Sequence, residues 1–282
     1  MKHILLSLFV ITQLGCSEDK LPKYVELNSL RVLALVADTP EVAPGATVTL
    51  TPAISDINGS GGLMFTAEAC VDPGVYFGVE PACTATMTGY QSLGVNVPLT
   101  TPTVANNYTG AANSFTVTVP SSSTIFANKS TRDQYNGVAY LVTYTLDSGD
   151  GRRVKSFRRI SVVNTALRPT LNSNPTVTDI LSNGTSLTTY PAGQTVTLSA
   201  QISSTPETYS VMNTEGGLKS ITETHQTTWF ISDGSLKYYR TLSTDGNEYA
   251  AVATAPSTRK AFIISVTRDG RGGMAVVTKA FP

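Results

Sequence analysis

Most of the chain consists of short segments in which apolar and polar residues alternate. The alternation is clear at residues 48–54, 115–119, 138–146 and 262–266. Because successive side chains of a strand point to opposite faces of its sheet, each segment predicts a strand with one buried face. Turn-forming pairs separate the segments, among them Pro44-Gly45, Asp150-Gly151, Asp233-Gly234 and Asp269-Gly270. We therefore predict an all-β protein that has no long amphipathic helix after its N-terminal segment.

One predicted strand occurs twice in the chain. Residues 45–55 align without a gap with residues 193–203, and most of the aligned positions are identical. The two halves also end alike, because Asp150-Gly151-Arg152 corresponds to Asp269-Gly270-Arg271. The repeat indicates two copies of one domain, and each half is long enough to bury a core of its own.

The two domains are expected at residues 27–165 and 166–282. The boundary between them falls in the polar stretch 164–175, which contains Pro169 and Pro175. Exposed polar segments with proline are typical of domain boundaries, because few contacts cross them.

The composition narrows the class of protein. Charged residues make up 14% of the chain and the formal net charge is zero, whereas a typical soluble domain has about 25% charged residues. The chain has no long cluster of Lys and Arg, so it lacks the electrostatic footprint of a nucleic-acid-binding protein. Its densest basic stretch, residues 152–159, is expected on the solvent-facing side of a late strand, with an anionic surface partner as the alternative.

The N-terminus has the pattern of an export signal. Met1-Lys2-His3 precedes the apolar run 4–11, which closes on Gln13-Leu14-Gly15-Cys16. The run is too short to span a bilayer. The pattern resembles a bacterial lipoprotein signal peptide, and the resemblance implies that residues 1–15 are removed and that Cys16 carries acyl chains such as palmitate. Residues 16–26 are then a tether, and the expected location is the cell envelope at the outer membrane, on its surface or its periplasmic face.

Export also bears on the remaining cysteines. Only Cys70 and Cys83 follow Cys16, and an even pair in a chain that enters an oxidising compartment predicts a disulfide bond. Two separate buried thiols are the alternative. A metal site is not expected, because a lone cysteine pair without a neighbouring histidine does not resemble a structural zinc site.

Several motifs resemble the immunoglobulin-like repeats of bacterial surface and periplasmic lipoproteins. They are the Pro-Gly-x-x-Val-x-Leu pattern at 44–50, the segment 228–234 around Trp229, and the final Asp-Gly-Arg-Gly-Gly at 269–273. The resemblance implies two tandem immunoglobulin-like β-sandwiches, and the subfamily, bacterial Ig-like or polycystic-kidney-disease-like, stays open. Trp229 is expected to be a core anchor, with stacking on a sugar ring as the alternative. Tyr238-Tyr239 and Tyr249 are expected to be partly exposed, with only one ring of the pair pointing outward.

Catalytic chemistry finds little support in the sequence. His225 is the only histidine after the signal segment, and neither a GxSxG nor an HExxH motif occurs. Residues 56–61 loosely resemble a calcium loop, but Ala67 stands where such a loop usually has glutamate. We therefore predict no catalytic residue, no metal ligand and no cofactor.

These observations lead to a functional expectation. The chain is expected to be a lipid-anchored, non-enzymatic envelope protein that acts as a binding, adhesion or spacer module. The alternatives are a periplasm-facing scaffold or assembly subunit and, less favoured, an uncharacterised hydrolase. The expected partners are the membrane, through the N-terminal lipid, and a protein or glycan, but not a nucleic acid. Residues 89–113 and 121–134 are either a recognition insertion or solvated connectors.

Overall fold

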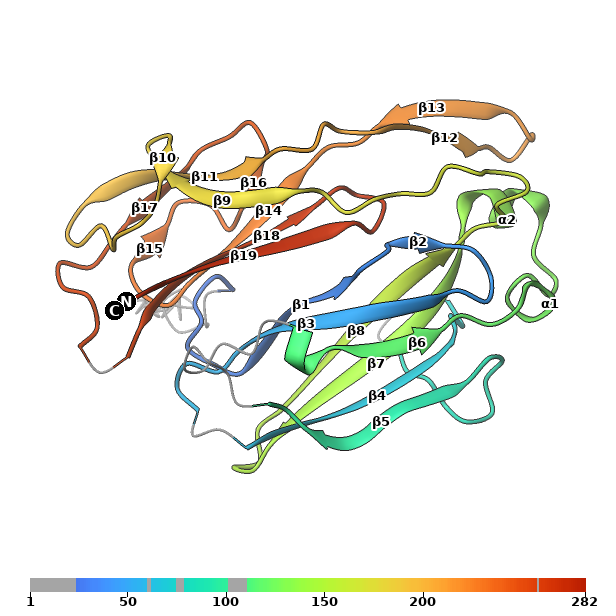
Figure 1. Cartoon of the computed structure of the whole chain (residues 1–282), viewed down its shortest axis with the longest axis horizontal. Helices are drawn as coiled ribbons and strands as arrows, with labels where there is room; N and C mark the ends of the chain where they lie inside the picture. Colours follow the sequence, from blue (N-terminus) through green and yellow to red (C-terminus); the bar gives the residue numbers. More distant parts are fainter. Residues whose placement is uncertain (1–23, 60–61, 75–78, 101–110, 258) are drawn as a thin grey trace, which may run out of the picture.

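The alternating segments form the strands of two β-sandwiches, which pack side by side (Figure 1). The computed structural model describes residues 24–59, 62–74, 79–100, 111–257 and 259–282. The signal segment 1–15 and the lipidation candidate Cys16 lie outside the described residues. In the part of the chain that is described, no helix has both the length and the apolar character needed to cross a membrane.

The first sandwich pairs a three-stranded sheet with a five-stranded sheet. The sheet orders are β1-β3-β6 and β2-β8-β7-β4-β5. Its elements are β1 (Arg31–Ala37), β2 (Glu41–Val42), β3 (Thr47–Ser55), β4 (Leu63–Val71), β5 (Gln91–Pro98), the 3₁₀ turn η2 (Ala111–Asn113), β6 (Phe115–Thr118), α1 (Ser122–Ile125), α2 (Thr131–Asn136), β7 (Val138–Ser148) and β8 (Arg153–Val162). The chain changes sheets between β1, which runs antiparallel to β3, and β2, which runs parallel to β8.

The second sandwich repeats this plan with a five-stranded and a four-stranded sheet. The orders are β10-β9-β11-β17-β15 and β16-β14-β18-β19, and β12 and β13 form a separate hairpin. Its strands are β9 (Val177–Ser182), β10 (Thr185–Ser186), β11 (Thr195–Ile202), β12 (Thr208–Met212), β13 (Leu218–Thr222), β14 (Gln226–Ile231), β15 (Ser235–Leu236), β16 (Arg240–Leu242), β17 (Asn247–Ala250), β18 (Ala261–Arg268) and β19 (Met274–Phe281). In both sandwiches this order of strands is that of an immunoglobulin-like fold, which agrees with the fold class expected from the sequence.

The repeated strand occupies the same place in both sandwiches. Residues 45–55 and 193–203 contribute β3 and β11, the second long strand of each half. The turn before each strand uses a glycine with positive φ, 78° at Gly45 and 69° at Gly193. Gly151 and Gly270, in the last hairpin of each half, have φ values of 85° and 87°. Because side chains disfavour this left-handed region, the matching glycines explain why these positions repeat.

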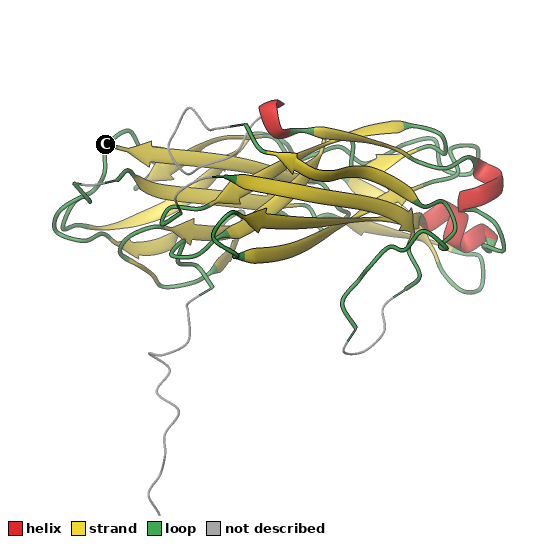
Figure 2. Cartoon of the chain, turned by 90° about the horizontal axis from the view of Figure 1, so that it is seen from below, coloured by secondary structure: helices red, strands yellow, loops and turns green. Residues whose placement is uncertain are grey.

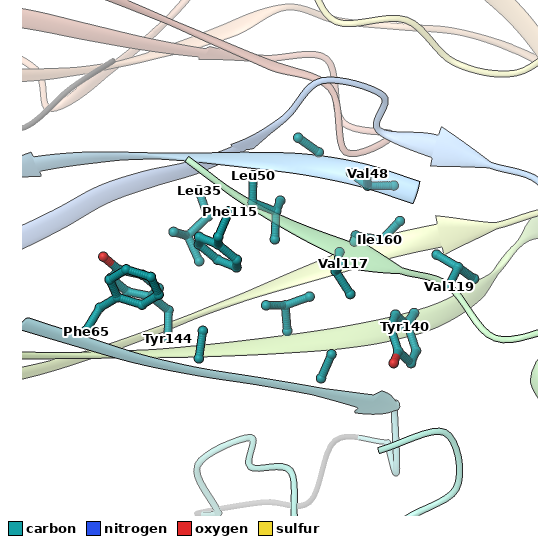
Figure 3. Close-up of a cluster of buried hydrophobic side chains, with 14 of the residues drawn as sticks. Leu35, Val48, Leu50, Phe65, Phe115, Val117, Val119, Tyr140, Tyr144 and Ile160 are labelled. Atoms are coloured by element: carbon teal, nitrogen blue, oxygen red, sulfur yellow. The ribbon is translucent and has the colours of Figure 1, made fainter. Parts of the chain in front are cut away.

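The core of the first sandwich is centred on stacked aromatic rings (Figure 3). Phe65, Phe115 and Tyr144 stack with ring centroids 5.2 to 5.7 Å apart. Strand β7 buries alternate residues almost along its whole length, as its period of two predicts. Burial raises the pKa of the Tyr140 hydroxyl to about 12, and this hydroxyl donates to the backbone oxygen of Gly89.

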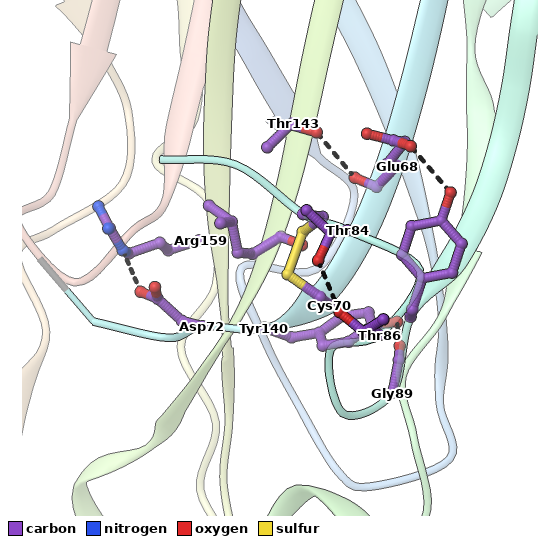
Figure 4. The surroundings of a disulfide bond; sticks show 12 residues. Glu68, Cys70, Asp72, Thr84, Thr86, Gly89, Tyr140, Thr143 and Arg159 are labelled. Carbon is purple, nitrogen blue, oxygen red and sulfur yellow. Dashed lines mark hydrogen bonds and ion pairs between the residues drawn. A yellow bond between two sulfur atoms is a disulfide. The ribbon is translucent and has the colours of Figure 1, made fainter. Parts of the chain in front are cut away.

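Cys70 and Cys83 form a disulfide bond, as the sequence predicts (Figure 4). Cys70 lies on β4 and is fully buried, and both cysteines pack against Leu141 of β7. The bond ties the loop after β4 back to the sheet. Near the bond, the side chain of Arg159 donates to Asp72 at 2.5 Å, which holds the start of the same loop.

The segments 89–113 and 121–134 contain regular structure as well as loop. The first includes strand β5, which pairs with β4 at the edge of its sheet. The second includes α1 and the start of α2, which lie at the end of the molecule opposite the C-terminus (Figure 2). Ser130 and Asp133 form a capping box at the start of α2, and α2 contacts β12 of the second sandwich through two hydrogen bonds between Asn136 and the backbone of Met212.

An apolar cluster joins the two sandwiches. It contains residues of β1, of β3 and the turn after it, and of the segment before β1 on one side, and residues of β14 and β18 on the other. The buried members are Leu27, Leu33, Ala34, Ala53, Ile57, Phe230, Phe262, Ile264 and Val266. Both faces of β14 and β18 are therefore buried, one in the core of the second sandwich and one against the first.

A buried network of charges lies beside this apolar contact. The carboxylate of Glu41, on β2, accepts two hydrogen bonds of 2.9 Å from Arg168 and one of 2.8 Å from Arg271. Its Oε2 also accepts from the backbone nitrogen of Asn172 at 2.8 Å. Arg271, in the hairpin between β18 and β19, donates in addition to Glu207 and Glu223. One carboxylate thus binds the first sandwich, the connecting segment and the second sandwich together.

We predict that Arg271→Gln lowers the free energy of unfolding by about 3–5 kcal/mol, because the change leaves the buried carboxylate of Glu223 without its cation and removes one of the two cations of Glu41. The matched control is Arg153→Gln. The Arg153 side chain is 64% exposed and pairs with Asp147, and such surface pairs contribute about 1 kcal/mol or less. Urea unfolding measures both variants. Equal losses in the two variants would show that the network does not stabilise the contact between the sandwiches.

Candidate functional site

A groove on the second sandwich, the tyrosine groove, is the main candidate for a binding site. It has a volume of about 750 Å³, and it is lined by the segment that connects β15 to β16, by β16 itself, by the start of β14 and by the turn after β16. The lining residues are Gln226, Lys237, Tyr238, Tyr239, Arg240, Thr241, Leu242, Asp245 and Gly246. Aromatic rings, two cations and several hydrogen-bonding groups therefore meet at one surface.

The groove lies where the chain crosses from one sheet to the other. Strand β15 pairs with β17 in one sheet, whereas β16 pairs with β14 in the opposite sheet. Residues 237–239 bridge the two sheets, and their backbone is held from both sides. The amide of Asn247, which is fully buried, donates to the oxygen of Tyr238 at 2.8 Å and accepts from its nitrogen at 3.1 Å. On the other side, the backbone nitrogen of Trp229 donates to the oxygen of Tyr239 at 3.0 Å.

Both tyrosines of the pair are exposed. Tyr238 is 52% and Tyr239 is 56% accessible to solvent, so the expectation that only one ring points outward is wrong. The physical reason is the crossing: residues 237–239 lie between strands rather than in one, and the alternation of a pleated strand does not apply there.

Cations lie against the exposed rings. Lys237 Nζ is 5.7 Å from the centre of the Tyr238 ring, and the Arg240 guanidinium is 5.5 Å from that of Tyr239. The N-terminal segment adds a third aromatic residue, because Tyr24 packs edge-on against Tyr239 at 6.4 Å and against Phe230 at 5.6 Å. These pairs hold the rings in place at the surface, since cation–π and aromatic contacts each contribute about 0.5–1 kcal/mol at exposed sites.

The same N-terminal segment is bound to the second sandwich through its backbone. The nitrogen of Ile231 donates to the oxygen of Val25 at 2.9 Å, and the nitrogen of Leu27 donates to the oxygen of Ile231 at 2.8 Å. Residues 24–26, the described end of the expected tether, therefore lie beside the groove, and Tyr24 also accepts a hydrogen bond from Arg31 of the first sandwich.

Trp229 and Tyr249 lie beneath the groove. Trp229 is fully buried, and its indole nitrogen donates to Thr241 Oγ1 at 2.9 Å. It belongs to the core of the second sandwich, where no sugar ring can stack on it. Tyr249 was expected to be partly exposed, but it is fully buried because strand β17 turns it into the same core. Its hydroxyl donates to the backbone oxygen of Asp233 at 2.9 Å, and burial raises its pKa.

The remaining candidates from the sequence do not gather into a catalytic site. His225 is 3% exposed, so it has little contact with solvent. The Asp56 carboxylate, the first position of the calcium-like loop, is buried and forms an ion pair with Arg152. Among the described residues, no group of three or more His, Cys, Asp and Glu side chains is placed to hold a metal ion.

The basic stretch 152–159 does not face solvent at every residue. Arg152 pairs with Asp56 and Asp150, and Arg159 pairs with Asp72. Arg158 is only 6% exposed, so the expectation that this stretch faces solvent is wrong for Arg158. It lies near the edge of its sheet, where the second sandwich covers it: its Nη2 donates to the backbone oxygen of Gly272.

Comparisons with known proteins bear on the fold. No family model matches the chain, and no curated protein matches it. Among solved structures it is similar to the N-terminal Ig1-2 module of the Drosophila receptor protein tyrosine phosphatase DLAR, with 11% identity over 90% of this chain and 97% of that chain and a TM-score of 0.25. It is also similar to the two tandem V-type regions of the chitin-binding protein VCBP3 (14% identity, 90% and 98% covered, TM-score 0.29) and to the D0-D1 domain of Intimin (13% identity, 89% and 98% covered, TM-score 0.21). Because superposition is loose at such TM-scores, the immunoglobulin-like fold rests on the strand order described above.

We predict that Asn247→Ala lowers the free energy of unfolding by about 2 kcal/mol, because it leaves the backbone nitrogen and oxygen of Tyr238 without their partner. The matched variant is Tyr238→Ser, which removes an exposed ring and its cation–π contact with Lys237 and is expected to lower the free energy by no more than about 1 kcal/mol. Thermal or urea unfolding measures both. A loss in Tyr238→Ser as large as that in Asn247→Ala would mean that the ring, and not the amide, holds the crossing segment.

Proposed function

We propose that this protein is a lipid-anchored binding module of the cell envelope, and that the tyrosine groove is its binding surface. The observation that carries the proposal is the pair of exposed rings, Tyr238 and Tyr239, on a segment whose backbone is held at Tyr238 by the buried amide of Asn247. Exposed aromatic residues with restricted freedom are common in binding surfaces, because they bury much area and lose little entropy on binding.

The position of the groove relative to the tether limits where its partner lies. Tyr24 touches the groove residue Tyr239, and only residues 17–23 separate Tyr24 from Cys16. The eight residue steps from Cys16 to Tyr24 span at most about 29 Å when fully extended. With a lipid on Cys16, the groove stays within about that distance of the anchoring membrane. This favours a protein or glycan partner in or on the same membrane, as the scaffold alternative requires.

The first prediction concerns the anchor and the membrane face. Cys16→Ala is expected to release the protein from the membrane fraction, because the change removes the site of lipidation. Ser17→Ala is the matched control and leaves the protein in the membrane. Fractionation of cells with quantitative blotting measures both variants, and retention of Cys16→Ala in the membrane would refute the lipid anchor. Protease treatment of intact cells distinguishes the two faces, since cleavage favours a surface adhesion role and protection favours a periplasmic scaffold.

The second prediction concerns the groove. A photoreactive benzoylphenylalanine in place of Tyr239 is expected to form a covalent adduct with the partner in intact cells, because its ring replaces one that contacts the partner. The matched control places the same group at Leu218, which is 60% exposed on the hairpin of β12 and β13. Blotting after irradiation detects the adduct. The groove is not the binding surface if position 239 gives no adduct or if both positions give the same one.

A further inference from the structure

A second pocket lies at the junction of the two sandwiches. It has a volume of about 410 Å³ and is bounded by β1, by the free edge of β8 and by the hairpin between β18 and β19. Three arginines line it, Arg158 and Arg159 from the first sandwich and Arg268 from the second. The rest of its lining is apolar or small, including Leu33, Phe157 and Met274, and none of the described residues that line it is acidic.

The main feature of the pocket is the buried side chain of Arg158. More than nine-tenths of this residue is buried, and no acceptor for its Nε is found among the described residues. Among the described residues, the only hydrogen bond of its side chain joins Nη2 to the backbone oxygen of Gly272. Burial, opposed by the charge of Asp269 and aided by that of Arg268, lowers the pKa of Arg158 to about 10. A guanidinium in this state is stabilised by an anion that reaches its free nitrogen.

The nearby carboxylates are already bound elsewhere. Asp269 accepts from the backbone nitrogens of Arg271 and Gly273 through Oδ1, and from the Asn172 amide through Oδ2. Asp72 pairs with Arg159 on the other side of β8, yet Nη2 of Arg159 is buried without a partner in the described residues. Arg268 donates to the hydroxyl of Thr228 and faces Tyr24 and Arg240, and none of the ion pairs among the described residues includes it.

We propose that the junction pocket binds a phosphate group carried by a ligand or lipid. The planar guanidinium presents donors in a fork that fits the oxygens of phosphate, and two or more arginines at one site favour a group with more than one negative charge. The apolar wall formed by Leu33 and Met274 contacts the part of the ligand that bears the phosphate. Because the arginines come from both sandwiches, the bound group bridges them.

The test measures binding of inorganic phosphate to the purified protein by isothermal titration calorimetry, at constant ionic strength maintained with chloride. The wild-type protein is expected to bind phosphate, and Arg268→Gln to bind it at least tenfold more weakly. Arg158→Met is expected to abolish binding. Arg153→Gln, on the same strand but with 64% of its side chain exposed, is the matched control and binds as the wild type does. Circular dichroism verifies that each variant folds, and Arg268→Gln keeps the test decisive if Arg158→Met does not.

A second arm identifies the source of the phosphate. Sedimentation with vesicles of phosphatidylglycerol, compared with phosphatidylcholine, shows whether a lipid headgroup reaches the pocket. Sedimentation that is lost in Arg268→Gln assigns the site to an anionic lipid, and phosphate binding without sedimentation assigns it to a soluble phosphate compound. The proposal is overturned if phosphate binds no better than chloride, or if Arg268→Gln and Arg158→Met bind it as tightly as the wild type. The test does not involve the tyrosine groove, so a negative result for phosphate binding leaves the proposed function untouched.

Discussion

The arrangement of the two sandwiches depends on the buried carboxylate of Glu41. It is 4% exposed and accepts hydrogen bonds from Arg168, Arg271 and the backbone of Asn172. A carboxylate removed from water to this extent needs its partners, because losing one leaves a buried charge without compensation. Apolar contacts such as those of β1 against β18 have little directional preference and tolerate sliding. The ion pairs do not tolerate sliding. They therefore select one relative position of the sandwiches from the many that would bury similar apolar area.

The junction pocket exists only in that position, whereas the groove is lined by the second sandwich alone. The groove owes its third ring to Tyr24, which precedes the first sandwich but packs on Phe230 and Tyr239 of the second. The junction pocket places Arg158 of one sandwich beside Arg268 of the other. If the domains were free to rotate, Arg158 would return to solvent and its free nitrogen would be satisfied by water. The unsatisfied guanidinium is therefore a consequence of the docking, which is the reason that a ligand at this place would also strengthen the contact.

The sequence predicts what depends on local rules and misses what depends on distant contacts. Alternation identifies β3 and β7, and the repeat identifies β11, because strand period and turn glycines act over a few residues. The partners of Glu41 are 127 and 230 residues away in the chain, so no spacing rule relates them. One signal for the docking was present: consecutive apolar residues at 229–231 and 261–264 break the period of two, which indicates that both faces of those strands are buried. The sequence does not predict the groove, because the alternation of a strand does not hold at Tyr238 and Tyr239, where the chain crosses between sheets.

The side-by-side packing also separates two of the possible roles. A spacer benefits from domains joined end to end, since each then adds its full length to the distance from the membrane. Here the sandwiches overlap along their sides (Figure 1), and the contact of Asn136 with Met212 closes the junction at the end that carries α2. This packing gives up reach and gains a rigid composite surface, with elements of both domains fixed near the N-terminal segment. Loss of length is a disadvantage for a spacer but not for a receptor or a scaffold that holds a partner close to its own membrane, so the geometry favours binding over spacing.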